Sequence, residues 1–83
     1  MHQIPLEYAK WIGKYREKVG ATAGKCREAA IGMNAVFPEL VPDRGMVLAA
    51  DGMMYMHWWL VGPFGEIVDP TEDQFGRIVS YPT

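Results

Sequence analysis

Three residues of this chain have side chains that could be combined in one catalytic site: Cys26, His57 and Asp69. A cysteine thiolate is a nucleophile, and an imidazole can take up and return a proton near neutral pH. A carboxylate can hold such an imidazole in one orientation through a hydrogen bond. Cys26 is the single cysteine of the chain, so it is the only candidate thiol. The elements between the three residues decide whether they can meet.

His57 and Asp69 are expected on neighbouring antiparallel strands. Residues 53–61 have the apolar and aromatic character of a strand, and Gly62-Pro63-Phe64-Gly65 then turns the chain so that residues 66–69 return beside it. A three-residue loop pairs position 57 with position 69, and a four-residue loop shifts the pairing by one. In either register the carboxylate can accept a hydrogen bond from the imidazole.

Two helices are expected before the sheet, at about residues 5–19 and 24–36. Apolar residues recur in both at steps of three and four, and Pro5 suits a first helical turn. Gly20 and Pro38 supply the stops. Cys26 then lies in the first turn of the second helix, on its inward face. Backbone N–H groups without partners and the helix dipole stabilise a thiolate there.

The remaining sequence predicts an antiparallel sheet over about residues 46–81. Strands at 46–50 and 53–61 flank Asp51-Gly52, which is typical of a two-residue hairpin turn. Residues 77–81 could add a last strand. The order of helix, helix and antiparallel sheet predicts one α+β domain spanning residues 1–83.

The composition excludes several classes of protein. The net charge of −2 argues against a nucleic-acid partner, and no apolar run approaches the ~18 residues that span a bilayer. The first residues lack the features of a secretory signal. One cysteine cannot form an internal disulfide and suits a reducing compartment. We therefore expect a cytoplasmic domain without a membrane or nucleic-acid partner.

Three short motifs together resemble a known family. They are Gly24-x-Cys26, His57-Trp58-Trp59 and Gly65-x-Ile67-Val68-Asp69-Pro70-Thr71. In this order they resemble the catalytic core of the transglutaminase-like branch of papain-like cysteine enzymes, above all small bacterial and phage-type members. The resemblance covers about residues 22–75. It implies that Cys26 is the nucleophile, His57 the general base and Asp69 the orienting acid. It also implies action on peptide or protein amides without an organic cofactor, in the host cytoplasm if the protein is phage-encoded.

The substrate-binding groups are less well defined. Papain-type enzymes carry a glutamine shortly before the cysteine to bind the oxyanion, and residues 17–25 contain neither Gln nor Asn. The second oxyanion donor is therefore left open among Gln3, Trp11, Thr22 and Gln74. Trp58 and Trp59 point to opposite faces of their strand, so we expect one in the core and the other beside a substrate groove. Trp58, Trp59 and Gln74 are the candidate substrate-binding residues.

Two functions remain open on these grounds. The first is a cysteine-dependent hydrolase or acyl transferase acting through a Cys-His-Asp triad. The alternative is a non-catalytic protein-binding module on the same fold, in which an aromatic patch contacts a partner. A zinc site of His2, Cys26, His57 and Asp69 is weaker, because these residues lack close paired spacing. The oligomeric state is open, a homodimer included. Four methionines of the hairpin are expected to fill the core or an interface: Met46, Met53, Met54 and Met56.

Overall fold

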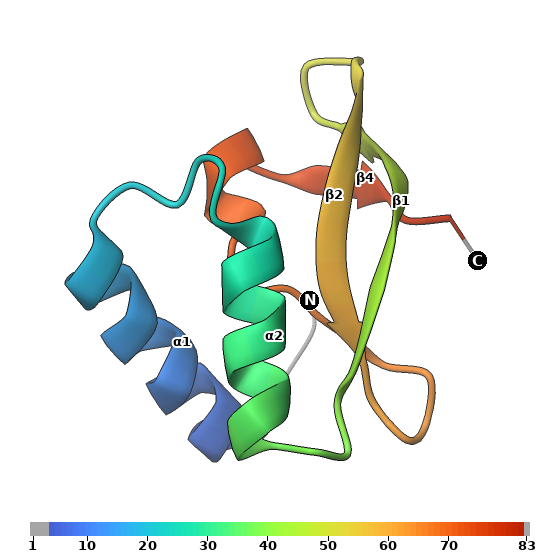
Figure 1. Ribbon diagram of the computed structural model, residues 1–83. Helices are drawn as coiled ribbons and strands as arrows, with labels where there is room; N and C mark the ends of the chain where they lie inside the picture. Colours follow the sequence, from blue (N-terminus) through green and yellow to red (C-terminus); the bar gives the residue numbers. More distant parts are fainter. Residues whose placement is uncertain (1–3, 83) are drawn as a thin grey trace.

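Two helices precede a four-stranded antiparallel sheet in the computed structural model, which describes residues 4–82 (Figure 1). The elements are α1 (Leu6–Val19), α2 (Cys26–Val36), β1 (Val41–Ala49), β2 (Met54–Val61), β3 (Ile67–Val68), the 3₁₀ turn η1 (Glu72–Phe75) and β4 (Ile78–Ser80). The strand order is β3-β2-β1-β4. The α+β class predicted from the sequence is confirmed.

The helices follow the sequence signals closely. Pro5 occupies the N-cap of α1, and Gly20 ends the helix with a φ of 73°. That left-handed conformation favours glycine, which has no Cβ to clash. α2 begins at Cys26, two residues later than expected, because Gly24 also takes a positive φ of 76° and keeps the preceding loop out of the helix.

β1 differs from its prediction at both ends. It begins at Val41 rather than at residue 46. The sequence did not predict the first part of the strand, because proline and glycine, here Pro42 and Gly45, are rare in strands. β4 pairs with β1 only at Leu48 and Ala49, so the earlier part of β1 is a sheet edge, where proline is tolerated. The connection to β2 is longer than the two residues predicted, since the Ala49 N–H bonds to the Met53 carbonyl.

The register between β2 and β3 also corrects a prediction. Leu60 pairs with Val68 and Val61 with Ile67, so continuing this register places Asp69 opposite Trp59 rather than His57. The loop is longer than expected because the Glu66 carboxylate folds back and accepts a hydrogen bond from the Phe64 N–H, 3.0 Å away. It packs directly over Gly62, where a Cβ would meet the Glu66 Oε1 at 1.9 Å.

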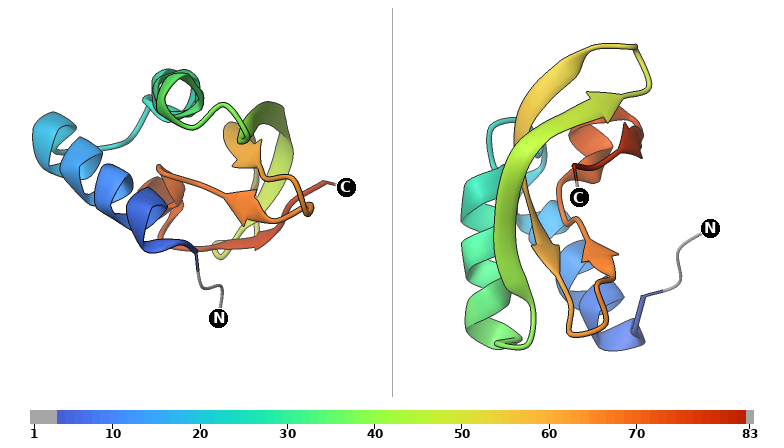
Figure 2. Two further views of the ribbon diagram at one scale, coloured as in Figure 1. Left: turned by 90° about the horizontal axis from the view of Figure 1, so that it is seen from below. Right: turned by 90° about the vertical axis from the view of Figure 1, so that its right-hand side faces the viewer.

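The sheet has an apolar cluster on each face. The first cluster joins both helices to the sheet and contains Tyr8, Ile12, Ala30, Met33, Leu40, Leu60 and Val68. The second lies beside η1 and β4 and contains Val47, Trp59 and Ile78, with Tyr55, Phe75 and Tyr81 packed against it. Figure 2 (right) shows α2 on one side of the β1–β2 hairpin and η1 with β4 on the other. β2 therefore contributes alternate side chains to two separate cores.

Candidate functional site

His57 and Asp69 form a buried pair. The His57 Nε2 lies 2.7 Å from the Asp69 Oδ2, and the two side chains are 0 % and 2 % exposed. The Phe75 and His57 rings pack in a T-shaped arrangement with a centroid separation of 4.9 Å, and Trp59 lies beside the imidazole. Aromatic packing and one hydrogen bond therefore fix the orientation of the imidazole ring. The hydrogen bond between His57 and Asp69 was predicted from the sequence.

Asp69 reaches His57 although the two positions are not opposite in the register. β3 ends at Val68. Asp69 is two residues after Ile67 and therefore shares its face of the sheet, where Ile67 packs in the second cluster with Trp59. Residues two apart on one face of an antiparallel pair are diagonal neighbours. The carboxylate therefore crosses diagonally to His57 from the residue that follows the strand.

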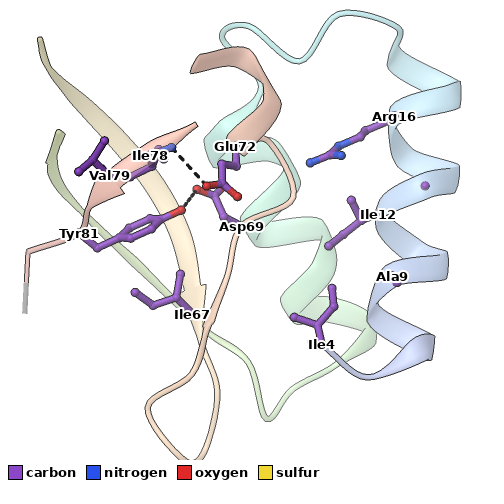
Figure 3. Close-up of a pocket in the computed structure, with 11 residues that line it drawn as sticks. Ile4, Ala9, Ile12, Arg16, Ile67, Asp69, Glu72, Ile78, Val79 and Tyr81 are labelled. Atoms are coloured by element: carbon purple, nitrogen blue, oxygen red, sulfur yellow. Dashed lines mark hydrogen bonds between the residues drawn. The ribbon is translucent and has the colours of Figure 1, made fainter. Parts of the chain in front are cut away.

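Two further donors hold the carboxylate. The Tyr81 hydroxyl donates to the Asp69 Oδ2 at 2.6 Å (Figure 3). The Thr71 N–H donates to the Oδ1 at 3.2 Å. Burial raises the pKa of Tyr81 far above its ordinary value, and the adjacent charge and hydrogen bond of Asp69 raise it further. Tyr81 is not among the site residues predicted from the sequence. Only the pairing of β4 with β1 reveals its role.

The other imidazole nitrogen has no partner. His57 Nδ1 is buried and makes no hydrogen bond to any residue in the range 4–82. Because Asp69 accepts from Nε2–H, the neutral ring carries its free lone pair on Nδ1, as assigned from the hydrogen-bond network. An unpaired buried acceptor costs about 1–3 kcal/mol. The unpaired Nδ1 therefore lowers the stability of the fold, and it leaves this nitrogen available to accept a proton.

The start of α2 is tied to the segment that carries Asp69. The Thr22 hydroxyl donates to the Asp73 Oδ1 at 2.7 Å, and the Gly24 N–H donates to the Gln74 Oε1 at 3.4 Å. From α1, the Arg16 Nε donates to the Pro70 carbonyl at 3.0 Å. These contacts hold the residues just before Cys26 against η1, whose Phe75 packs on His57.

Cys26 itself is not paired with His57. It is the first residue of α2 and is a partly exposed free thiol. The expected hydrogen bond between its Sγ and His57 is absent, since Nδ1 has no partner in the described chain. α2 packs through Ala30 and Met33 on the cluster that contains Leu60. The His57 side chain points to the opposite face of β2 from Leu60, and so away from α2. The structure assembles the histidine–acid pair and leaves the thiol outside it.

The three candidate substrate-binding residues have different surroundings. Trp59 is 1 % exposed and packs in the second cluster, so its assignment to a substrate groove is corrected: it is a core residue. Trp58 is half-buried on the face of β2 opposite to His57, beneath the guanidinium groups of Arg27 and Arg44. Gln74 is half-buried and links Thr71 to the loop before Cys26.

Tyr15 is a candidate that the sequence did not single out. Its hydroxyl is buried without a hydrogen-bond partner in residues 4–82, and its ring stacks on Trp11 at 5.2 Å. Burial raises the pKa of Tyr15, and the nearby Glu28 carboxylate raises it further. Its apolar helical spacing suggested only a core residue. Of the earlier oxyanion candidates, Thr22 is committed to Asp73, and Gln3 lies outside the described residues.

A cavity of about 450 Å³ lies between α1 and the strands β3 and β4 (Figure 3). Ile12 and Ile67 supply apolar wall, while Arg16, Asp69 and Tyr81 lie at its polar end. The Asp69 oxygens already accept from protein donors, and the Arg16 Nε is bound to a carbonyl. Neither His57 nor Cys26 lines this cavity, so it is not where a bond to Cys26 would form.

The described residues hold no group of three or more potential metal ligands. His2, part of the zinc alternative, lies outside them. No helix in residues 4–82 has both the length and the apolar character needed to cross a membrane. Comparison of the chain with models of known families, with curated proteins and with solved structures found no significant match. The function therefore has to be argued from the site itself.

Proposed function

We propose that this protein is a cysteine-dependent enzyme that hydrolyses or transfers the acyl group of a peptide or side-chain amide. Cys26 is the nucleophile, His57 the base and Asp69 the orienting acid. The observation that carries the proposal is the state of His57, which is buried, held through Nε2 by Asp69 and left without a partner at Nδ1. A histidine kept only for the core would be expected to satisfy both nitrogens.

The chemistry uses Nδ1 as the proton carrier. Nδ1 takes the proton of the Cys26 thiol, and the thiolate attacks the amide carbonyl carbon. The C–N bond then breaks, and the Nδ1 proton passes to the leaving amine, which leaves a thioester on Cys26. Water or a second amine attacks this thioester, gives up a proton to Nδ1 and releases the acyl product as the thiol is restored.

Two donors are proposed for the oxyanion. The Cys26 backbone N–H is in the first turn of α2, where such groups have no intrahelical partner. The buried Tyr15 hydroxyl is the second, because it lies within electrostatic range of Cys26; the Glu28 carboxylate competes for the same hydroxyl. It takes the place of the glutamine that the sequence lacks before the cysteine.

The mechanism requires the Cys26 Sγ to come within about 4 Å of Nδ1. Catalytic hydrogen bonds are often long before a substrate binds, but α2 packs on the face of β2 opposite to His57, so this bond forms only if the start of α2 moves toward the imidazole. The same packing favours a second candidate function, a protein-binding module on the same fold in which His57 and Asp69 are structural. The two functions differ in what they imply for the reactivity of the thiol.

Alkylation of the single cysteine distinguishes them. We expect iodoacetamide to label Cys26 faster in the folded protein than in the urea-unfolded chain at the same slightly acidic pH. His57→Ala should remove that advantage, and Asp69→Asn should reduce it by less. Cys26→Ala serves as the blank and should remain folded, because loss of one partly exposed sulfur creates little cavity. Slower labelling of the folded wild type, unaffected by His57→Ala, would establish the binding-module alternative.

A further inference from the structure

The outer half of the β1–β2 hairpin presents an apolar surface on one side. Met46 pairs with Met56 and Leu48 with Met54, so their side chains lie side by side on the same face. Met46, Met54 and Met56 are 45 %, 52 % and 64 % exposed. We call these four residues the methionine face. Its three methionines were expected to fill a core or an interface, and neither apolar cluster within residues 4–82 contains them.

α2 covers only the other half of the same sheet face. Leu60 is fully buried in the cluster that contains Ala30 and Met33, and Trp58 is half-buried. Figure 1 shows the hairpin extending well past the start of α2. The methionine face therefore continues an interface that α2 begins, and nothing else in the described chain lies over it.

The boundary between the covered and uncovered halves is positively charged. Arg27 of α2 and Arg44 of β1 both place their guanidinium groups over Trp58, at 5.7 Å and 5.6 Å from the ring. The paired positions on this face from residue 42 to 48 and from 54 to 60 include Arg44 and no carboxylate. The surface thus combines an adaptable apolar area with cations at one end.

We propose that the methionine face docks a segment of another protein that is apolar along one side and carries carboxylates at the end meeting Arg27 and Arg44. Unbranched methionine side chains adapt to partner side chains of different shape. Stacked guanidinium groups keep donors available for carboxylates while they cover an aromatic ring. This proposal does not involve His57 or Asp69, which lie on the opposite face of β2, although Arg27 directly follows Cys26 in α2.

Two other occupants fit less well. A second copy of the chain would bring the same arginine-bearing face, which has no carboxylate to meet the cations. A lipid surface normally requires more basic charge than two arginines, and the chain has a net charge of −2. Both become outcomes of the test.

The test uses methyl-labelled methionine and two synthetic peptides. Each peptide is a helix of about 14 residues, or four turns, with leucines at spacings of three and four; one has glutamates at one end and the other lysines. In methyl NMR titrations we expect the Glu peptide to shift Met46, Met54 and Met56, while the buried Met33 stays unchanged as an internal control. It should bind about threefold to tenfold tighter than the Lys peptide.

Charge reversal supplies the matched variants. Arg44→Glu should invert the preference between the two peptides, while Lys10→Glu, which makes the same charge change on exposed α1, should leave it intact. Equal binding of both peptides, or no saturable shift with either, would overturn the proposal. So would shifts of the same methyl groups on raising the protein concentration alone, which indicate self-association, or on adding anionic vesicles, which indicate a lipid surface.

Discussion

Asp69 lies just beyond β3 and accepts a hydrogen bond from His57 of β2 across a diagonal of the sheet, with 2.7 Å between the His57 Nε2 and the Asp69 Oδ2. The same carboxylate oxygen also accepts from Tyr81, at the far end of the described chain. A single buried oxygen therefore joins β2 to the segments that follow β3 and β4. The candidate base is held by contacts that are distant in sequence, and this makes the site sensitive to changes far from Cys26.

Asp69→Ala should destabilise the fold strongly. It leaves the donors of His57, Tyr81 and the Thr71 N–H without their acceptor, and unpaired buried groups are costly. We expect a loss of about 3 kcal/mol in the free energy of unfolding, measured by urea denaturation. Asp43→Ala is the control, because that exposed carboxylate bonds only to the next backbone N–H, and its loss should be within about 0.5 kcal/mol. Similar losses in both variants would mean that the buried network contributes little.

The decrease in the free energy of unfolding at alkaline pH should depend on the tyrosine side chains. The pKa of Tyr81 is raised above the ordinary value of 10.0 by burial first and then by Asp69. The hydrogen bond to Glu39, followed by burial, raises that of Tyr8 to about 12. The unfolded chain therefore releases these protons before the native state does. This contribution to stability is fully present below about pH 10 and is lost as the pH rises toward the native values.

Phenolate absorbance and urea denaturation across that pH range measure this directly. Native tyrosines should titrate later than those of the unfolded chain. Tyr81→Phe should flatten the decline in the free energy of unfolding above pH 10 and should cost about 1 kcal/mol at neutral pH, for the lost hydrogen bond to Asp69. An unchanged alkaline slope in Tyr81→Phe would show that its hydroxyl titrates as freely in the folded state as in the unfolded one.

Two glycines should respond oppositely to alanine. At Gly45 a Cβ would lie 2.9 Å from the Pro82 ring and 3.3 Å from the Trp59 ring, so Gly45→Ala should cost about 1–3 kcal/mol. At Gly13, inside α1, nothing lies within 4 Å of the added Cβ. Gly13→Ala should therefore stabilise the protein by about 1 kcal/mol through helix propensity. Thermal unfolding of the two variants tests both signs, and a stabilised Gly45→Ala would contradict the close approach to Trp59.

The sequence was sufficient for the helices and for the pairing of His57 with Asp69. Helix spacing and the glycine and proline stops are local signals, so the ends of α1 and α2 were predicted within two residues. The histidine–acid pair was predicted because both residues flank one turn. Its register was wrong by two residues, since the length of that turn depends on the Glu66 side chain folding over Gly62.

Other parts of the site depend on contacts that no local pattern encodes. Tyr81 joins the pair only because β4 adds to the distant edge of β1. Trp58 and Trp59 are adjacent and chemically identical, and only the two-sided packing of the sheet decides that Trp59 is the core residue. The position of Cys26 relative to His57 depends on how α2 packs across the sheet, which helix and strand periodicities do not specify.

β3 has consequences for how this chain tolerates insertions and deletions. The strand has two residues and two pairings with β2, too few to fix a register by themselves. Asp69 is held instead by side-chain bonds and by the Arg16 contact to Pro70. Length changes in the exposed turn before Ile67 can be absorbed at the tip of the loop. A residue inserted between Val68 and Asp69 would turn the carboxylate to the other face of the sheet, away from the imidazole.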